Sequence, residues 1–88
     1  MLSGLVQKQA RYLPDHIRRA LRTWTLLIEE QGIWAMRKVP GYHDEPLKGD
    51  RKGQRSSRLS RGYRVVYEEY DSGEIVIVSV KEVMKHAY

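Results

Sequence analysis

The chain has 88 residues, of which 41% are hydrophobic and 31% charged, with no cysteine and a formal net charge of +5 at pH 7. This length and balance fit a single small domain over residues 1–88, and they exclude a second domain, a disordered tail and a disulfide or thiolate–metal framework. No apolar run approaches the roughly 20 residues needed to cross a bilayer, and the N-terminus lacks the apolar core of a signal peptide, so we expect a cytoplasmic protein with no membrane partner.

The first half of the chain predicts a long helix. Residues 1–12 follow neither a strand period nor a clear helical stripe, and their form stays open. After Pro14, apolar side chains recur every three or four positions, as they do on one face of a helix, and Gly32 is a natural stop. The stripe consists of Ile17, Ala20, Leu21, Trp24, Leu27 and Ile28.

A second, shorter helix is predicted over residues 33–39. Pro40-Gly41 closes it, because these residues break helices and favour turns. Two amphipathic helices need a surface to pack on. We expect Trp24 and Trp34 to anchor the core through their large aromatic area rather than to stack on bases.

The second half of the chain changes to the pattern of β-strands after a loop over residues 41–53. Residues 55–60 and 63–69, separated by Arg61-Gly62, predict a hairpin. A turn then leads to residues 74–80, which are apolar at nearly every position, as in a central strand covered on both faces.

The predicted fold class is therefore α+β. A helical hairpin packs on one face of a small, mainly antiparallel twisted sheet, and the form of the tail over residues 81–88 stays open.

Positive charge is concentrated in residues 48–64. This stretch holds seven basic residues and one acid, a balance of +6 that exceeds the +5 of the whole chain. Such a cluster is typical of a surface that holds phosphates. Besides Arg64, the residues interpreted as contacts for RNA or phosphate are Lys48, Arg51, Lys52, Arg55, Arg58 and Arg61.

Alternation of side chains along the hairpin assigns these residues to two faces. The apolar positions are expected to point toward the helices, and they are Leu59, Tyr63, Val65 and Tyr67. Arg58 and Arg64 then point to the opposite, uncovered face. One such arginine is most often an ordinary solvated charge, but two on one uncovered face within a basic stretch favour a binding surface.

Few side chains could carry chemistry beside these cations. Metal-free cleavage of RNA needs a base for the 2′-hydroxyl, a cation for the charged phosphorane and an acid for the departing 5′-oxygen. The candidate bases and acids are Glu45, His43, His86 and Tyr88. Their spacing leaves the roles open, because Glu45 could simply pair with an arginine and the last residues could be a frayed terminus. The three histidines lie too far apart for a metal motif, so we expect no metal and no cofactor.

Four motifs resemble those of a known group. They are Glu45-Pro-Leu-Lys-Gly-Asp50, Arg58-Leu59, Tyr63-Arg-Val-Val-Tyr67 and the terminal His86-Ala87-Tyr88. Together they resemble the RelE/YoeB/HigB group of bacterial toxin–antitoxin toxins over roughly the C-terminal half of the chain. The resemblance implies a RelE-like fold and a metal-independent endoribonuclease that cuts messenger RNA in the ribosomal A site and is silenced by a cognate antitoxin.

The same resemblance implies roles for individual residues. Glu45 matches the general base of the YoeB pattern, Arg64 the arginine that stabilises the phosphate, and Tyr88 the terminal tyrosine. In the YoeB pattern a histidine directly precedes that tyrosine, whereas here Ala87 separates it from His86, a spacing closer to that of HigB.

Two other functions stay open. A gyrase-inhibiting toxin of the ParE type would share the fold without needing this catalytic set, whose joint presence argues against it. A non-catalytic RNA-binding module would need exposed rings for stacking bases, and the available rings are those of Tyr42, Tyr63 and Tyr70.

Overall fold

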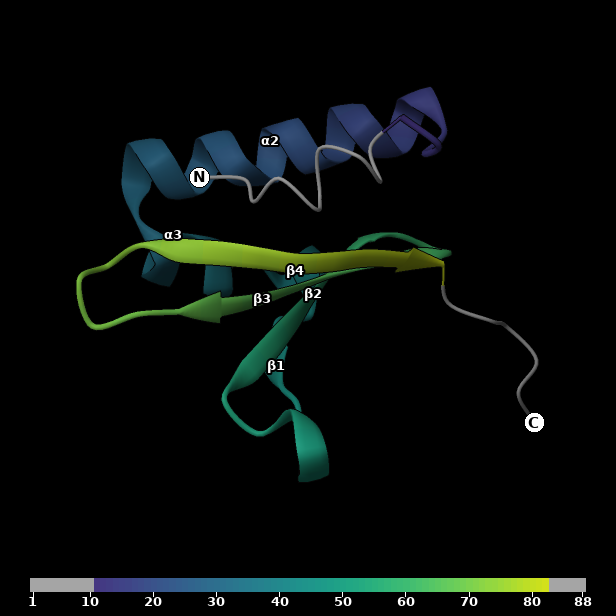
Figure 1. Cartoon of the computed structure of the whole chain (residues 1–88). Coiled ribbons are helices and arrows are strands. Elements are labelled where there is room, and N and C mark those ends of the chain that lie inside the picture. The colour runs from purple at the N-terminus through teal and green to yellow at the C-terminus, as the bar shows by residue number, and fades with distance from the viewer. Residues whose placement is uncertain (1–10, 83–88) are drawn as a thin grey trace.

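The computed structural model describes residues 11–82, and it consists of a long helix lying over one face of an antiparallel sheet (Figure 1). This arrangement confirms the predicted α+β fold class. The open question over residues 1–12 falls almost entirely outside the described residues, as do His86 and Tyr88. Between residues 11 and 82, no helix is long and apolar enough to span a membrane.

The long helix, α2, spans Asp15–Gln31 and confirms the predicted stripe and its boundaries. Pro14 directly precedes the helix, and its carbonyl accepts hydrogen bonds from two backbone amides of the first turn. The helix ends at Gly32, whose φ of 93° is favourable only for glycine and whose N–H donates to the Ile28 carbonyl at 2.8 Å. The helix buries Ile17, Leu21 and Trp24 against the sheet.

The second helix, α3, spans only Ile33–Arg37, and a 3-10 turn, η1, follows at Pro40–Tyr42. The helix buries Ile33 and Met36, which lie three positions apart on one face. Trp34 falls on the other face and is 67% exposed, so the prediction that it anchors the core is wrong. The same prediction is confirmed for Trp24, which is fully buried.

The sheet contains four strands, β1 (Glu45–Pro46), β2 (Gln54–Ser60), β3 (Tyr63–Glu69) and β4 (Ile75–Glu82). They pair antiparallel in sequence order, which confirms the predicted hairpin of β2 and β3. The segment expected to be a loop contains β1 and a second 3-10 turn, η2, at Gly49–Arg51. A strand of two residues is too short to produce a detectable period.

The strand buried on both faces is β3 rather than β4. Val65, Val66 and Tyr67 are consecutive and all buried, whereas β4 lies at one end of the order of described strands. The apolar run over residues 74–80 therefore does not mark a central strand among the described ones. The core lies between α2, α3 and the sheet, and it includes Ile17, Leu21, Trp24, Ile33, Met36, Val65, Tyr67, Ile75, Ile77 and Val80.

Candidate active site

The strand register gathers three cations on the sheet face that points away from α2. Arg64 on β3 is paired with Arg58 on β2 and with Lys81 on β4. Val65 and Tyr67 point into the core on the opposite face, as alternation requires. The prediction that Arg58 and Arg64 share the face not covered by the helices is therefore confirmed.

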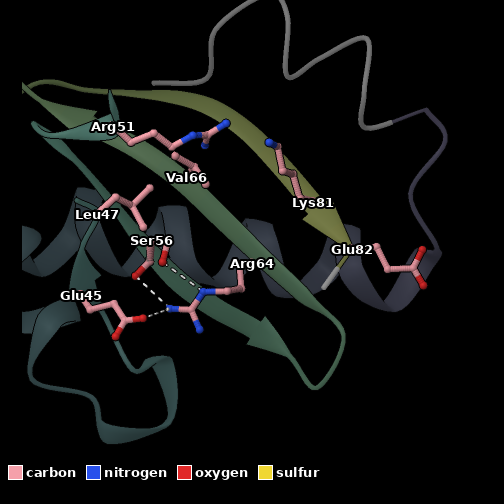
Figure 2. A pocket seen from close by; sticks show the side chains of 8 residues that line it. All are labelled: Glu45, Leu47, Arg51, Ser56, Arg64, Val66, Lys81 and Glu82. Carbon is pink, nitrogen blue, oxygen red and sulfur yellow. Dashed lines mark hydrogen bonds and ion pairs between the residues drawn. The ribbon is translucent and has the colours of Figure 1, made fainter. Parts of the chain in front are cut away.

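The guanidinium of Arg64 is held in place from two sides (Figure 2). Its Nε donates to Ser56 Oγ at 3.0 Å, and its Nη2 donates to the His43 carbonyl at 3.1 Å and to the Ser56 carbonyl at 3.4 Å. The same Nη2 lies 3.5 Å from Glu45 Oε1. The guanidinium is thereby fixed in the middle of the row of cations, between Arg58 and Lys81, and the Arg64 side chain stays 23% exposed.

Glu45 reaches this position because β1 pairs with β2. Glu45 is the partner of Ser56, so its side chain lies on the same face as that of Arg64. Close by in the chain, His43 has a left-handed backbone with φ of 42°, an uncommon conformation for a residue other than glycine. The Glu45 side chain is 62% exposed, so its carboxylate is accessible from solvent. Two residues predicted separately from sequence are thus brought together.

A shallow hollow of about 400 Å³ lies beside this pair. Leu47 and Val66 form an apolar part of its lining. Arg51, Arg64 and Lys81 give the rest of the lining a positive charge. Figure 2 shows the side chains of Arg51 and Lys81 in the upper half of the view, above Arg64. The hollow combines a surface suited to a flat ring with donors suited to phosphate oxygens.

The other predicted cations divide into two kinds. Five of them are exposed, as expected for contacts to a large anion, and they are Lys48, Arg51, Lys52, Arg58 and Arg61. Arg55 differs, because its side chain is only 29% exposed and its Nε donates to Asp44 Oδ1 at 2.7 Å. Its register partner is Tyr67, a core residue, so Arg55 does not lie on the face of Arg64. The expectation that Arg55 is a surface cation is wrong.

Asp44 forms a buried cluster that sequence reasoning did not detect. Its side chain is completely buried, and it accepts hydrogen bonds from Ser57 Oγ at 2.6 Å and from the Tyr67 hydroxyl at 2.7 Å, in addition to the one from Arg55. Arg37 Nε lies 3.6 Å away. Burial of the Tyr67 hydroxyl, together with its hydrogen bond to Asp44, raises the pKa of Tyr67 to about 12.

Sequence reasoning also missed Ser56 and Lys81. Lys81 pairs with Arg64 across β3 and β4, so it belongs to the row of cations. This pairing could not be predicted, because the register shifts at a bulge between Val66 and Tyr67 that the sequence does not reveal.

In the described stretch from residue 11 to residue 82, no group of three or more His, Asp or Glu side chains is arranged to hold a metal ion.

Comparison with known proteins supports the fold. No family model and no curated protein sequence matches the chain. A YoeB–YefM complex from Staphylococcus aureus matches with a TM-score of 0.72 and 22% identity, over 96% of this chain and 94% of that one. YafQ from E. coli strain BL21(DE3) matches with a TM-score of 0.70 and 19% identity, over 92% and 88% of the two chains.

A third match is the RelBE2 toxin–antitoxin complex from Mycobacterium tuberculosis, with a TM-score of 0.65, 20% identity and 93% of each chain covered. These identities are low, but the matches extend over nearly the whole chain. The resemblance suggested by the motifs is thereby confirmed at the level of three-dimensional structure: the chain has the fold of the RelE/YoeB-type toxins.

Proposed function

We propose that the chain is the toxin of a type II toxin–antitoxin system and that it acts as an endoribonuclease, an mRNA interferase, on messenger RNA in the ribosomal A site. The observation that carries this proposal is the distance of 3.5 Å between the Arg64 guanidinium and the exposed Glu45 carboxylate, beside the hollow on the basic face. A general base and a phosphate-binding fork at this separation can act on one ribonucleotide.

In the proposed reaction, an incoming phosphate displaces the Glu45 carboxylate from Nη2 of Arg64 and binds there. Among the described residues, the contacts of Arg64 use Nε and Nη2, so Nη1 is available for a second phosphate oxygen. The displaced Glu45 carboxylate then lies near the adjoining ribose and removes the proton of its 2′-hydroxyl. Arg64 stabilises the negative charge that develops on the phosphorane, where a preorganised donor is most effective.

The 2′-oxygen forms a bond to phosphorus as the bond to the 5′-oxygen breaks. The products are a 2′,3′-cyclic phosphate and a 5′-hydroxyl, and the departing oxygen must receive a proton. His86 and Tyr88 lie beyond the described residues. Their proposed role is to donate that proton or to align the leaving group. Every step uses side chains alone, so the proposed mechanism requires no metal.

Partners follow from the same proposal. The row of Arg58, Arg64 and Lys81, with the exposed cations around it, would attract RNA and ribosomal phosphates and speed their association. A ribonuclease in the cytoplasm must be held inactive, and the YoeB–YefM and RelBE2 neighbours are themselves toxin–antitoxin complexes. We therefore propose a cognate antitoxin that binds this chain and blocks its cleavage of RNA.

The decisive experiment is to induce the protein in cells and to map new 5′ ends on translated and untranslated copies of one transcript. We expect cuts confined to translated reading frames. Glu45→Gln should abolish most of them, because loss of a general base typically costs about 10²–10⁴-fold in rate. Glu82→Gln is the matched control, since Glu82 lines the same hollow and is exposed but has no described contact with Arg64.

Other outcomes of this experiment favour the competing functions. Growth arrest with relaxed or broken DNA and intact transcripts would support a gyrase-inhibiting toxin of the ParE type. Binding of RNA without any new 5′ end, in the wild type and in both variants, would support a non-catalytic RNA-binding module. Cleavage that is equal in the wild type and in Glu45→Gln would remove Glu45 from the mechanism.

A further inference from the structure

Asp44 and Glu45 are adjacent in the chain but have opposite surroundings. The Asp44 side chain is 0% exposed, whereas that of Glu45 is 62% exposed. A carboxylate is rarely buried without strong compensation, because loss of its hydration costs several kcal/mol. The contacts that compensate Asp44 must therefore be specific, and they fix its position closely.

These contacts come from three different elements. Ser57 and Arg55 on β2 donate at 2.6 Å and 2.7 Å, and Tyr67 on β3 donates at 2.7 Å. Arg37 on α3 adds an ion pair at 3.6 Å. Asp44 is thus tied at the same time to two strands and to the short helix, although it belongs to none of them.

The segment around Asp44 is held to the sheet by only a short strand pairing. The strand β1 contains two residues and makes only two register pairs with β2. His43, on the other side of Asp44, has a left-handed backbone, a conformation that persists only where the surroundings impose it. The other contacts of this segment are the ring of Tyr42, which packs against the core, and the Leu47 N–H, which donates to the Gln54 carbonyl at 2.8 Å. The buried carboxylate adds the hydrogen bonds that fix Asp44 itself between these two points.

Both neighbours of Asp44 contact the same guanidinium. The His43 carbonyl accepts from Arg64 Nη2 at 3.1 Å, and Glu45 Oε1 lies 3.5 Å from that atom. A shift of Asp44 would therefore move the hydrogen-bond acceptor of Arg64 and the carboxylate together. No contact between Asp44 and Arg64 is needed for this effect.

We propose that Asp44 is a positioning residue whose buried hydrogen bonds hold His43 and Glu45 in place, and so set the distance between the Glu45 carboxylate and the Arg64 guanidinium. The effect of Asp44 on the cleavage rate rests on the proposed ribonuclease function, whereas its effect on the positions of His43 and Glu45 does not. Asp44 contacts neither RNA nor the reacting atoms in this scheme. Its effect is on rate through geometry, since a misplacement of about 1 Å can cost about 10²-fold.

The test compares Asp44→Asn with the wild-type full chain. An asparagine has almost the same size but carries no charge, so Arg55 and Arg37 lose their shared buried counter-ion. The hydroxyls of Ser57 and Tyr67 would also have to turn and accept from the new NH₂ group. We expect the single-turnover cleavage rate at saturating programmed ribosomes to fall about 10²-fold, with the half-saturating concentration changed less than about threefold. Leu21→Ala is the control for lost stability, because it opens the core beneath α2 without touching the segment from His43 to Glu45.

A second readout does not depend on activity. The Nε–H of Arg64 donates to Ser56 Oγ and should give a resolved NMR signal that exchanges slowly with water. We expect Asp44→Asn to shift this signal and speed its exchange, and Leu21→Ala to leave it unchanged at a temperature where both variants are folded. If Asp44→Asn does not fold, Tyr67→Phe replaces it, since it removes one 2.7 Å donor to Asp44 and keeps the ring in the core.

Tyr67→Phe should change the same two readouts in the same direction, with a rate loss of about 3- to 10-fold, as for one hydrogen bond. A folded Asp44→Asn with an unchanged Arg64 signal would overturn the inference. So would a cleavage rate that Asp44→Asn and Leu21→Ala lower equally. Absence of cleavage by the wild type under all conditions would instead count against the ribonuclease function, and the NMR comparison would still decide the role of Asp44.

Discussion

Arg55 and Arg64 differ in what their partners allow them to do, although both are partly buried arginines paired with a carboxylate. Arg55 donates to Asp44, whose side chain is fully buried, at 2.7 Å. Arg64 lies 3.5 Å from Glu45, whose side chain is 62% exposed. A buried pair cannot exchange its partner without leaving a charge uncompensated, whereas an exposed pair can.

The comparison extends to the two faces of the sheet. On the face toward the helices, the Asp44 cluster adjoins the core, and the ring of Tyr67 meets that of Trp24 edge to face at 5.2 Å. On the other face, Arg64 has Arg58 and Lys81 as its register partners. The chain thus uses carboxylate–cation contacts for stability on one face, and on the other it arranges them so that an anionic ligand could replace the acid.

The largest expected effect is that of Arg64→Ala. Removing one preorganised donor from the phosphorane should lower the single-turnover rate about 10²–10³-fold. Binding to programmed ribosomes should weaken much less, because the exposed cations remain. The measurement is cleavage and binding by the same protein preparation.

Arg58→Ala is the matched control for this change. Arg58 is the register partner of Arg64 and is exposed, so its loss removes the same charge from the same face. We expect it to weaken binding while leaving the rate at saturation near that of the wild type. Equal losses of rate and binding in Arg64→Ala would mean that Arg64 only binds, and the contrast with Arg55 would lose its functional meaning.

The sequence predicted those parts of the molecule that repeat along the chain. The stripe from Ile17 to Ile28 identified α2, Gly32 identified its end, and alternation placed Arg58 and Arg64 on one face. The helix stripe and the strand faces follow side-chain periods of 3.6 and 2 residues, and each period is evident from several residues at once.

Features that depend on a single tertiary interaction could not be predicted in this way. Strand β1 forms because Glu45 and Pro46 pair with β2. Arg55 does not lie on the basic face, because its guanidinium donates to the buried carboxylate of Asp44. Trp34 is exposed because α3 is short and buries only two side chains on one face. For β1 and Arg55 the deciding neighbour is distant in sequence, and for Trp34 the deciding feature is the length of α3.

An intermediate effect is expected from the ionisation of Tyr67. Its pKa is raised to about 12 in the folded protein, whereas in the unfolded chain a tyrosine titrates near its ordinary value of about 10. The folded state therefore binds this proton more tightly, and the stabilisation is fully present below about pH 10. It declines as the pH rises through about 12, and the total decline reaches about 3 kcal/mol.

The measurement is the free energy of unfolding of the wild type minus that of Tyr67→Phe at several alkaline pH values. Taking the difference removes the contribution of the lysines and the other tyrosines. We expect the difference to fall between pH 10 and 12, as the buried hydroxyl ionises beside Asp44. A difference that stays flat over this range would show that the Asp44 cluster tolerates a second negative charge, which is incompatible with a tightly packed buried site.

The smallest expected effect concerns cations that contact neither Asp44 nor Glu45. Arg51 lines the hollow, Lys52 follows it in the chain, and both are exposed. Replacing both with Ala should lower the slope of log affinity against log salt by about two units, because each cation neutralises about one phosphate. Arg19 and Arg22 are the matched control, because they are also exposed but lie on α2, which covers the opposite face of the sheet (Figure 1). Their replacement changes the net charge by the same amount and should leave the slope unchanged if binding is local to the basic face. Equal slopes in the two double variants would mean that RNA responds to the total charge of the protein, and the face containing Arg64 would then have no special part in binding.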